Sequence, residues 1–211
     1  MSDSEKTPYL EPYRQAVEKF GPGFEATLWG TQRAQGLRFD VMIDLAGFEE
    51  CTILDAGCGL GDFGAHLIER EIPFTRYIGL DAMTPMVEKA IKRSLPRCEF
   101  QAADFVMTPE VMKQADPDYI CFSGTLNTMD DDMARGLVQS AFEASAQGVV
   151  FNFLSDRPHP RWLGKDLTPA RRFDVIAWLD WSMSLSSRVS FTQDYLEGHD
   201  ATIMIWHDGG A

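Results

Sequence analysis

Apolar residues recur at two different spacings along this chain of 211 residues, and the spacing changes near residue 50. Over residues 12–47 they recur every three or four positions, as on one face of a helix, and Thr31 stands where it can cap a helix start. Beyond that segment, short apolar runs alternate with helical patterns. We therefore expect a helical cover over residues 1–48 and a second part over residues 49–211, packed together as one compact unit.

The pattern of apolar residues over 49–211 predicts alternating strands and helices. Strands are expected at 51–56, 75–80, 97–102, 118–122 and 148–153, and helices at 62–70, 85–95, 109–115, 130–146 and 169–182, the last beginning at Thr168-Pro169. Two further β-like runs, 185–191 and 201–207, predict an antiparallel hairpin. We expect an α/β fold with a Rossmann-like, doubly wound, mostly parallel seven-stranded sheet that carries helices on both faces.

The first expected strand runs into a loop with three alternating glycines. Residues 51–61 read Cys-Thr-Ile-Leu-Asp-Ala-Gly-Cys-Gly-Leu-Gly. Glycine tolerates a positive φ and lets the backbone approach a ligand closely, and one tight turn seldom needs three glycines. The sequence therefore predicts that the backbone of this loop lies against a small molecule. The expected contact residues are Asp55, Ala56, Gly57, Cys58, Gly59 and Gly61.

The second and third expected strands each end near an acidic residue. Ligands bind at the carboxyl ends of the strands in open α/β sheets. Asp81 ends the second strand about 20 residues past the glycine loop, the offset at which an acidic side chain accepts both ribose hydroxyls. Asp104 ends the third strand and suits an adenine amino group. Taken alone, each carboxylate suits a helix cap as well as it suits a ligand contact. Together the two carboxylates predict a nucleoside pocket. Small or apolar neighbours complete the expected site: Ala82, Ala103, Phe105, Ser123 and Gly124.

The motif Asp55-Ala-Gly-Cys-Gly-Leu-Gly, followed by Asp81 and Asp104 in this rhythm of strands and helices, resembles the class I S-adenosylmethionine-dependent methyltransferases. The resemblance covers residues 51–153, and the final helix and hairpin are similar to that family's closing elements. It implies S-adenosyl-L-methionine as cofactor and S-adenosyl-L-homocysteine as product. It places the three glycines under the cofactor's amino-acid part, Asp81 on the ribose and Asp104 on the adenine amino group. Asp55 is then expected to orient the loop or the cofactor's ammonium.

Two alternatives stay open. The segment from Gly59 to Gly64 also fits G-x-G-x-x-G, and with Asp81 it predicts the dinucleotide site of an NAD(P)-dependent oxidoreductase. Asp62 in the first helical turn and Asp55 before the glycines put negative charge where a diphosphate would bind, which favours a cationic sulfonium instead. The second alternative is a non-catalytic regulatory protein that binds S-adenosylmethionine without transferring its methyl group.

Composition narrows the expected partners. The chain has 19 basic and 32 acidic residues, a net charge of −13, which disfavours nucleic acid and anionic membranes as partners. Neither a membrane-length apolar run nor a secretion signal is found, so we expect a cytoplasmic location and no membrane partner. No C-x-x-C pair occurs among the four cysteines, so we expect reduced thiols and no metal site. A small-molecule methyl acceptor fits these limits best.

Methyl transfer from a sulfonium is an in-line displacement, so positioning of the acceptor matters more than a dedicated catalytic residue. For a hydroxyl or acidic-carbon acceptor, His159 in the loop after the fifth strand is the candidate base, although a solvated histidine is the commoner arrangement. The stretch from Ser123 to Asn127 is expected to face the methyl group, with Asn127 as a substrate contact. Arg157 and Arg161, with Lys165, suit a carboxylate on the acceptor.

The helical cover has two possible roles in the sequence. Aromatic and basic side chains along it suit a lid over the acceptor, and they suit ordinary packing of an amphipathic cover equally well. Among them Trp29 is the expected substrate contact. The other members are Tyr9, Tyr13, Arg33 and Arg38.

Overall fold

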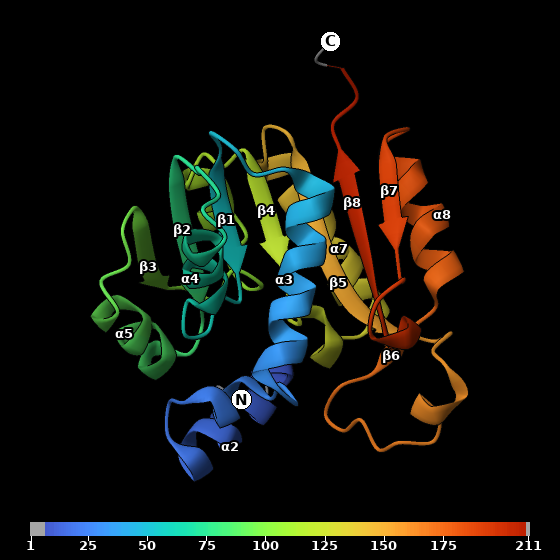
Figure 1. Ribbon diagram of the computed structural model, residues 1–211, viewed down its shortest axis with the longest axis horizontal. Helices are drawn as coiled ribbons and strands as arrows, with labels where there is room; N and C mark the ends of the chain where they lie inside the picture. The colour runs from blue at the N-terminus through green and yellow to red at the C-terminus, as the bar shows by residue number, and fades with distance from the viewer. Residues whose placement is uncertain (1–6, 210–211) are drawn as a thin grey trace.

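An eight-stranded sheet forms the centre of the molecule in the computed structural model, which describes residues 7–209 (Figure 1). The strand order is β3-β2-β1-β4-β5-β8-β7, and β6 pairs with β5 outside this path. The strands span Thr52–Ala56 (β1), Arg76–Asp81 (β2), Cys98–Ala102 (β3), Tyr119–Phe122 (β4), Gly148–Ser155 (β5), Arg172–Phe173 (β6), Val189–Thr192 (β7) and Asp200–Trp206 (β8). Residues 1–6 of the expected cover lie outside the described residues.

Parallel pairing brings the carboxyl ends of the first five strands to one edge of the sheet. Strands β1 to β5 pair in parallel, whereas β8 pairs antiparallel with β5 and β7. The predicted Rossmann-like sheet with a closing hairpin is therefore confirmed. The eighth strand, β6, is a two-residue addition to the seven that the sequence predicts.

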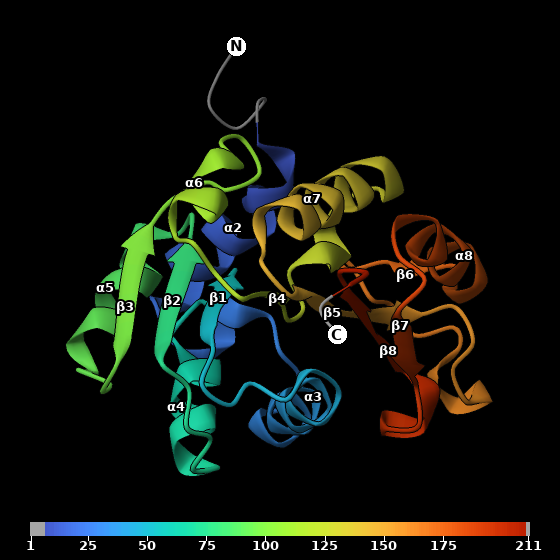
Figure 2. The ribbon, with the colours of Figure 1, turned by 90° about the horizontal axis from the view of Figure 1, so that it is seen from above.

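Helices cover both faces of the sheet (Figure 2). Their bounds are Glu11–Phe20 (α2), Gln32–Ala46 (α3), Asp62–Glu69 (α4), Thr84–Lys92 (α5), Glu110–Gln114 (α6), Asp131–Ala144 (α7) and Val175–Leu185 (α8). On one face, Phe39 of α3 stacks on Phe63 of α4, and both are buried. On the other face, Trp178 of α8 is fully buried against Phe151 of β5. Burying each such ring contributes about 1.5–3 kcal/mol, so the two cores hold the strand ends in fixed positions.

The part of the helical cover that precedes α3 lies below the carboxyl ends of the strands in Figure 1. It contains the short 3-10 helices Pro8–Leu10 and Phe24–Thr27 as well as α2, and it leads into α3. Thr31 caps α3 as expected, since its hydroxyl accepts a hydrogen bond from the backbone N–H of Ala34. The helical pattern over residues 12–47 is interrupted, because Gly21 adopts a φ of +75° that ends α2 and turns the chain across the sheet edge.

The helix expected at 169–182 begins later than the sequence predicts. Thr168-Pro169 is not a helix start, because Arg172 and Phe173 pair with the end of β5 and hold this segment extended. Helix α8 starts only at Val175, where the Asp174 side chain accepts a hydrogen bond from the N–H of Ala177. The loop 156–171 consequently lies at the same edge of the sheet as the helical cover.

Across residues 7–209, no helix has both the length and the apolar character needed to cross a membrane. Within the same range, no group of three His, Cys, Asp or Glu side chains is arranged to hold a metal ion. All four cysteines are free, and Cys51, Cys58 and Cys121 are buried, whereas Cys98 is partly exposed.

Candidate functional site

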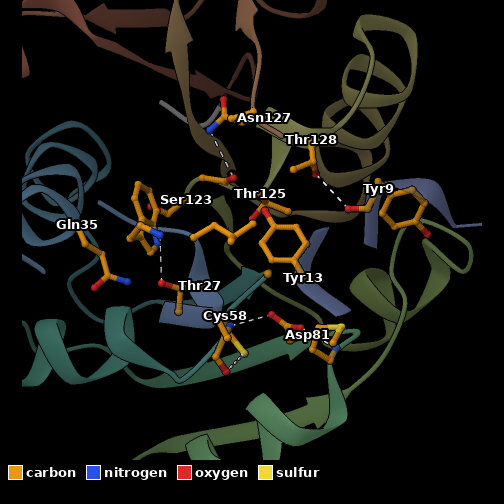
Figure 3. Close-up of a pocket in the computed structure, with 18 of the residues that line it drawn as sticks. Tyr9, Tyr13, Thr27, Gln35, Cys58, Asp81, Ser123, Thr125, Asn127 and Thr128 are labelled. Atoms are coloured by element: carbon orange, nitrogen blue, oxygen red, sulfur yellow. Dashed lines mark hydrogen bonds between the residues drawn. The ribbon is translucent and has the colours of Figure 1, made fainter. Parts of the chain in front are cut away.

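A cavity of about 480 Å³ opens at the carboxyl edge of the sheet. Its walls come from the loops after β1 to β5, from the helical cover and from the loop 166–170. Ten of its polar and aromatic residues appear together in Figure 3. A volume of this size is typical of small-molecule and cofactor sites.

The glycine loop after β1 forms one wall of this cavity. Gly57 has a φ of +94°, and a Cβ at this position would overlap the side chain of Thr125. Gly61 has a φ of +74°, and a Cβ there would lie 2.6 Å from the ring of Phe100. Only glycine satisfies both the backbone conformation and the packing at these two positions. Packing of the loop against Thr125 and Phe100 therefore requires glycine at these two positions, and Gly57 and Gly59 also line the cavity.

Asp81 connects the ends of β1 and β2. One carboxylate oxygen accepts a hydrogen bond from the Gly59 N–H at 2.8 Å, and the other accepts one from the Met83 N–H at 2.8 Å. Burial raises the pKa of Asp81, while these two backbone donors lower it. A carboxylate has about four lone-pair sites, so two remain for a ligand in the cavity.

Asp104 at the end of β3 is bound by the helical cover. The Tyr9 hydroxyl lies 2.8 Å and 2.9 Å from its two carboxylate oxygens. The N–H groups of Val106 and Met107 also donate to Oδ1 of Asp104. Oδ2 therefore keeps a lone pair for a ligand in the cavity, while Oδ1 is fully used.

Asp55 lies behind the glycine loop and is buried. The Tyr77 hydroxyl donates a hydrogen bond to its carboxylate. Burial raises the pKa of Asp55 to about 7, with the nearby Asp81 and Asp62 adding to the rise and the Tyr77 hydrogen bond opposing it. A positively charged ligand group at this end of the cavity would stabilise the ionised form.

The end of β4 meets the helical cover. A Cβ at Gly124 would lie 2.5 Å from the ring of Trp29, so that ring packs directly on the backbone. Asn127 is buried, and its side-chain oxygen accepts a hydrogen bond from the N–H of Leu154. Tyr13 from α2 lies near the middle of Figure 3, between Asp81 and Thr125, and burial raises its pKa to about 12.

The far end of the cavity is formed by α3 and the start of β8. The Arg38 guanidinium makes two hydrogen bonds to the Asp200 carboxylate, at 2.7 Å and 2.6 Å, and both side chains are buried. The same guanidinium lies 4.6 Å from the centroid of the Trp29 ring. His199 is the neighbouring wall residue, and burial followed by nearby Arg172 lowers its pKa to about 4.

Most of the predicted site residues line this one cavity. These are Asp55, Gly57, Cys58, Gly59, Asp81, Ala82, Asp104, Phe105, Ser123, Gly124, Trp29 and Asn127. Ala56, Gly61 and Ala103 support the same loops without lining the cavity. Thr125 lies within the predicted stretch from Ser123 to Asn127, whereas the sequence interpretation missed His199, which no local motif marks.

The first part of the loop after β5, residues 157–161, lies outside the cavity. His159, Arg157 and Arg161 are not among its wall residues, and each side chain is more than half exposed. Arg161 and His159 face Glu197, which forms an ion pair with Arg161. The loop folds toward the 3-10 helix Leu196–Gly198 instead of the ligand site, because the His159 N–H donates to the Glu197 carbonyl at 2.9 Å. We therefore give these three residues no part in the function proposed below.

Asp62 and Asp55 oppose a bound diphosphate less strongly in the structure than their positions in the sequence indicate. Asp62 forms an ion pair with Arg93 at 2.6 Å, so its charge is compensated. With a pKa of about 7, Asp55 is close to half neutral at physiological pH. The charges near the glycine loop therefore do not distinguish S-adenosylmethionine from a dinucleotide.

Comparison with known proteins supplies evidence that distinguishes the two cofactors. A family model described as a methyltransferase domain matches residues 48–151. This range contains the glycine loop, Asp81, Asp104 and Gly124. No curated protein sequence matches the chain.

Solved structures share the fold at low sequence identity. Magnesium protoporphyrin IX methyltransferase (ChlM) from Synechocystis PCC 6803, with bound S-adenosylhomocysteine, is 12% identical with a TM-score of 0.63, over 98% of this chain and 97% of that chain. Phosphoethanolamine N-methyltransferase 1 of Haemonchus contortus is 14% identical with a TM-score of 0.71, over 100% of this chain and 51% of that chain. The small RNA methyltransferase HEN1 is 12% identical with a TM-score of 0.67, over 83% of this chain and 25% of that chain. Since these three proteins have different acceptors by name, the fold does not identify the acceptor.

Proposed function

Because this chain belongs to the class I S-adenosylmethionine-dependent methyltransferases, we propose that it methylates a small-molecule acceptor held beside the methyl donor in the cavity. S-adenosyl-L-methionine is the donor and S-adenosyl-L-homocysteine the product. When bound, the donor supplies a methyl group already activated on a sulfonium sulfur. The protein's contribution is to bind both partners, align them and exclude water.

The size and the walls of the cavity are the observation that carries this proposal. The helical cover contributes Tyr9, Tyr13 and Trp29 to one side, and the loop 166–170 contributes to another. Residues at the carboxyl ends of the strands form a third side. In Figure 1, α2 lies below β1, β2 and β4. An acceptor that shares about 480 Å³ with a cofactor is a metabolite-sized molecule.

We assign the donor to the β1, β2 and β3 side. Gly57 and Gly59 present bare backbone, Asp81 has two free lone-pair sites for the ribose hydroxyls, and Asp104 has one on Oδ2 for the adenine amino group. Asp55 is placed to favour the donor's ammonium. The residues present therefore fit the cofactor's polar groups one by one.

We assign the acceptor to the β4, β5 and β8 side. Trp29, Asn127 and Leu154 line that part of the cavity. Neither Tyr13, with a pKa of about 12, nor His199, with a pKa of about 4, is matched to proton abstraction near pH 7. Catalysis in this proposal therefore comes from alignment of the acceptor, without a dedicated base.

Nucleic acid is the alternative class of acceptor, because the structurally similar protein HEN1 is a small RNA methyltransferase. A net charge of −13 opposes binding to a phosphate backbone. The carboxylates of Asp55, Asp81 and Asp104 also line the donor side of the cavity, beside which an acceptor must bind. These charges support a metabolite over RNA.

The proposal is tested in two stages on the full chain. Isothermal titration with S-adenosylmethionine, S-adenosylhomocysteine, NAD and NADP should give binding by the first two only. A methyl-release assay should then compare a panel of carboxylate, hydroxyl and amine metabolites with total RNA and with an unfolded protein mixture. Turnover confined to RNA or to protein would reject the small-molecule acceptor, and binding of NAD alone would reject the donor.

A further inference from the structure

The far end of the cavity contains a histidine whose ring is held on two sides. His199 precedes β8, and β8 is the third strand from β1 in the order β1-β4-β5-β8. At about 4.8 Å between neighbouring strands, this places His199 about 14 Å across the sheet from the glycine loop. A residue at that distance lies on the acceptor side of the cavity rather than under the donor.

Hydrogen bonding fixes the position of the proton on His199. Its Nδ1 lies 3.1 Å from Nη2 of Arg172. A guanidinium only donates hydrogen bonds, so Nδ1 must accept, and the proton of the neutral ring is then on Nε2. The ring also stacks on Trp162 at a centroid distance of 4.1 Å and an interplanar angle of 24°, which fixes its plane. His199 lines the cavity, and no described residue makes a hydrogen bond to its Nε2.

The charge behind this ring is positive and not neutralised by an ion pair. Arg172 donates to the carbonyl oxygens of Ser155, Trp162 and His199, and among the described residues no carboxylate lies within ion-pair distance of it. Arg38, by contrast, is paired with Asp200. A cation bound to Nδ1 polarises the ring and makes Nε2–H a stronger donor.

Other charged groups near this end largely offset one another. Lys165 lies 4.2 Å from the centroid of the Trp162 ring, and the neighbouring Asp166 also lines the cavity. The Asp166 carboxylate accepts a hydrogen bond from the Thr168 N–H. Arg38 is compensated by Asp200, and Asp156 near Arg172 lies 3.8 Å from Arg157. Arg172 therefore adds positive charge behind the ring without an ion-pair partner among the described residues.

We propose that His199 donates its Nε2–H to a carboxylate of the methyl acceptor and so selects acceptors that carry this group. Arg172 is then a positioning residue, which holds the tautomer without touching the acceptor. Apolar walls from Trp29, Phe39 and Leu154 would surround the body of such a molecule. This inference rests on the proposed function, since it names the acceptor class for the same cavity.

Nitrogen-15 NMR of the histidine rings tests the tautomer without any acceptor. The full chain saturated with S-adenosylhomocysteine should show His199 as the neutral Nε2–H form from pH 5.5 to 8. Arg172→Met should release Nδ1 and give a mixture of tautomers, whereas the neighbouring exposed Arg171→Met should leave the spectrum unchanged. An Nδ1–H tautomer or an imidazolium at pH 6 in the native chain would overturn the assignment.

Binding of benzoate tests the carboxylate preference, because its ring suits the apolar walls and its charge is isolated. On the chain loaded with S-adenosylhomocysteine, benzoate should bind at least tenfold more tightly than benzamide. His199→Phe should remove that preference, and His199→Gln, whose amide can still donate, should retain most of it. Equal binding of the two probes, no detectable benzoate binding, or an unchanged preference in His199→Phe would each overturn the inference. Failure of S-adenosylhomocysteine to bind would instead overturn the proposed function, while the NMR result for His199 would stand.

Discussion

The Tyr9 hydroxyl hydrogen-bonds the Asp104 carboxylate, with 2.8 Å to Oδ1 and 2.9 Å to Oδ2, although the two residues are 95 positions apart in the chain. Tyr9 is buried in the cover, and Asp104 is the carboxylate assigned to the donor's adenine. Docking of the cover is thus coupled to the same side chain that is proposed to bind the donor. Residues of the cover therefore form walls of the cavity in addition to packing on the strand ends.

Tyr9→Phe should loosen the cover. The substitution removes a hydrogen bond to a carboxylate, which contributes about 1.5–3 kcal/mol, while Asp104 keeps its two backbone donors. Hydrogen exchange should become faster in the amides of residues 9–20, and the free energy of unfolding should fall. Tyr119→Phe is the control, since it removes a hydroxyl bond to Gln147 away from the cover. Equal exchange rates over residues 9–20 in the native chain and the variant would contradict the coupling.

Asp81→Ala should weaken binding of S-adenosylmethionine by about 1–3 kcal/mol, through loss of charged hydrogen bonds to the ribose. The Gly59 N–H also loses its acceptor, so part of the loss comes from a looser loop. Calorimetry measures the affinity, and Asp81→Asn separates the charge from the shape of the side chain. Asp132→Ala on the exposed side of α7 is the matched control. Native affinity in Asp81→Ala would remove the ribose assignment.

Gly57→Ala should destabilise the fold and abolish donor binding. The added Cβ overlaps Thr125, and the φ of +94° is unfavourable for alanine, so we expect a loss of about 2–3 kcal/mol. Adding Thr125→Ala removes the overlap but leaves the backbone conflict, so the double variant should recover only part of the loss. Gly136→Ala is the control, because no atom lies within 4 Å of a Cβ there and alanine favours the α7 helix. Urea unfolding compares the three proteins, and equal stability of Gly57→Ala and Gly136→Ala would refute the steric account.

The sequence predicts those parts of the site that depend on local signals. The apolar run of β1 with the glycines after it, and the offset from that loop to Asp81, are encoded within about 30 residues, the span of one βαβ unit. His199 lies at the cavity only because β8 pairs antiparallel between β5 and β7. No local spacing of residues in the sequence predicts this strand order. His159 has the stronger local context after β5, yet Glu197 holds its loop away from the cavity. The residues on the acceptor side are therefore determined by the order of strands that are distant in the chain. The residues on the donor side are determined by local sequence patterns.

Asp55 should make the stability of the protein depend on pH. Its pKa in the folded state is about 7, above its ordinary value of 3.8, so its contribution to stability is fully present below pH 4 and lost as the pH rises through 7. By linkage the loss amounts to about 4 kcal/mol for an isolated group. Asp55→Asn keeps an oxygen for the Tyr77 hydroxyl but does not ionise, so its stability relative to the native chain should rise between pH 5 and pH 8. Urea unfolding at both pH values checks this, with Asp132→Asn as control, and parallel pH profiles for Asp55→Asn and the native chain would contradict it.

The buried pair of Arg38 and Asp200 should be far more important for stability than an exposed pair of the same kind. Arg38→Met leaves Asp200 buried without its partner, which destabilises by about 3–5 kcal/mol. The exposed pair of Arg70 and Asp40 has a similar distance of 2.6 Å, yet Arg70→Met should cost at most about 1 kcal/mol. Burial, not distance, sets the difference between them.

The pH dependence of Arg38→Met separates a lost ion pair from lost packing. Burial already raises the pKa of Asp200, and removal of the guanidinium raises it further. A raised pKa in the folded state means that stability is lost as the pH rises, so Arg38→Met should be more destabilised at pH 8 than at pH 5. Adding Asp200→Asn removes the unpaired charge, so the double variant should be more stable than Arg38→Met at pH 8. A pH-independent loss that Asp200→Asn does not relieve would assign the effect to packing against Trp29 instead.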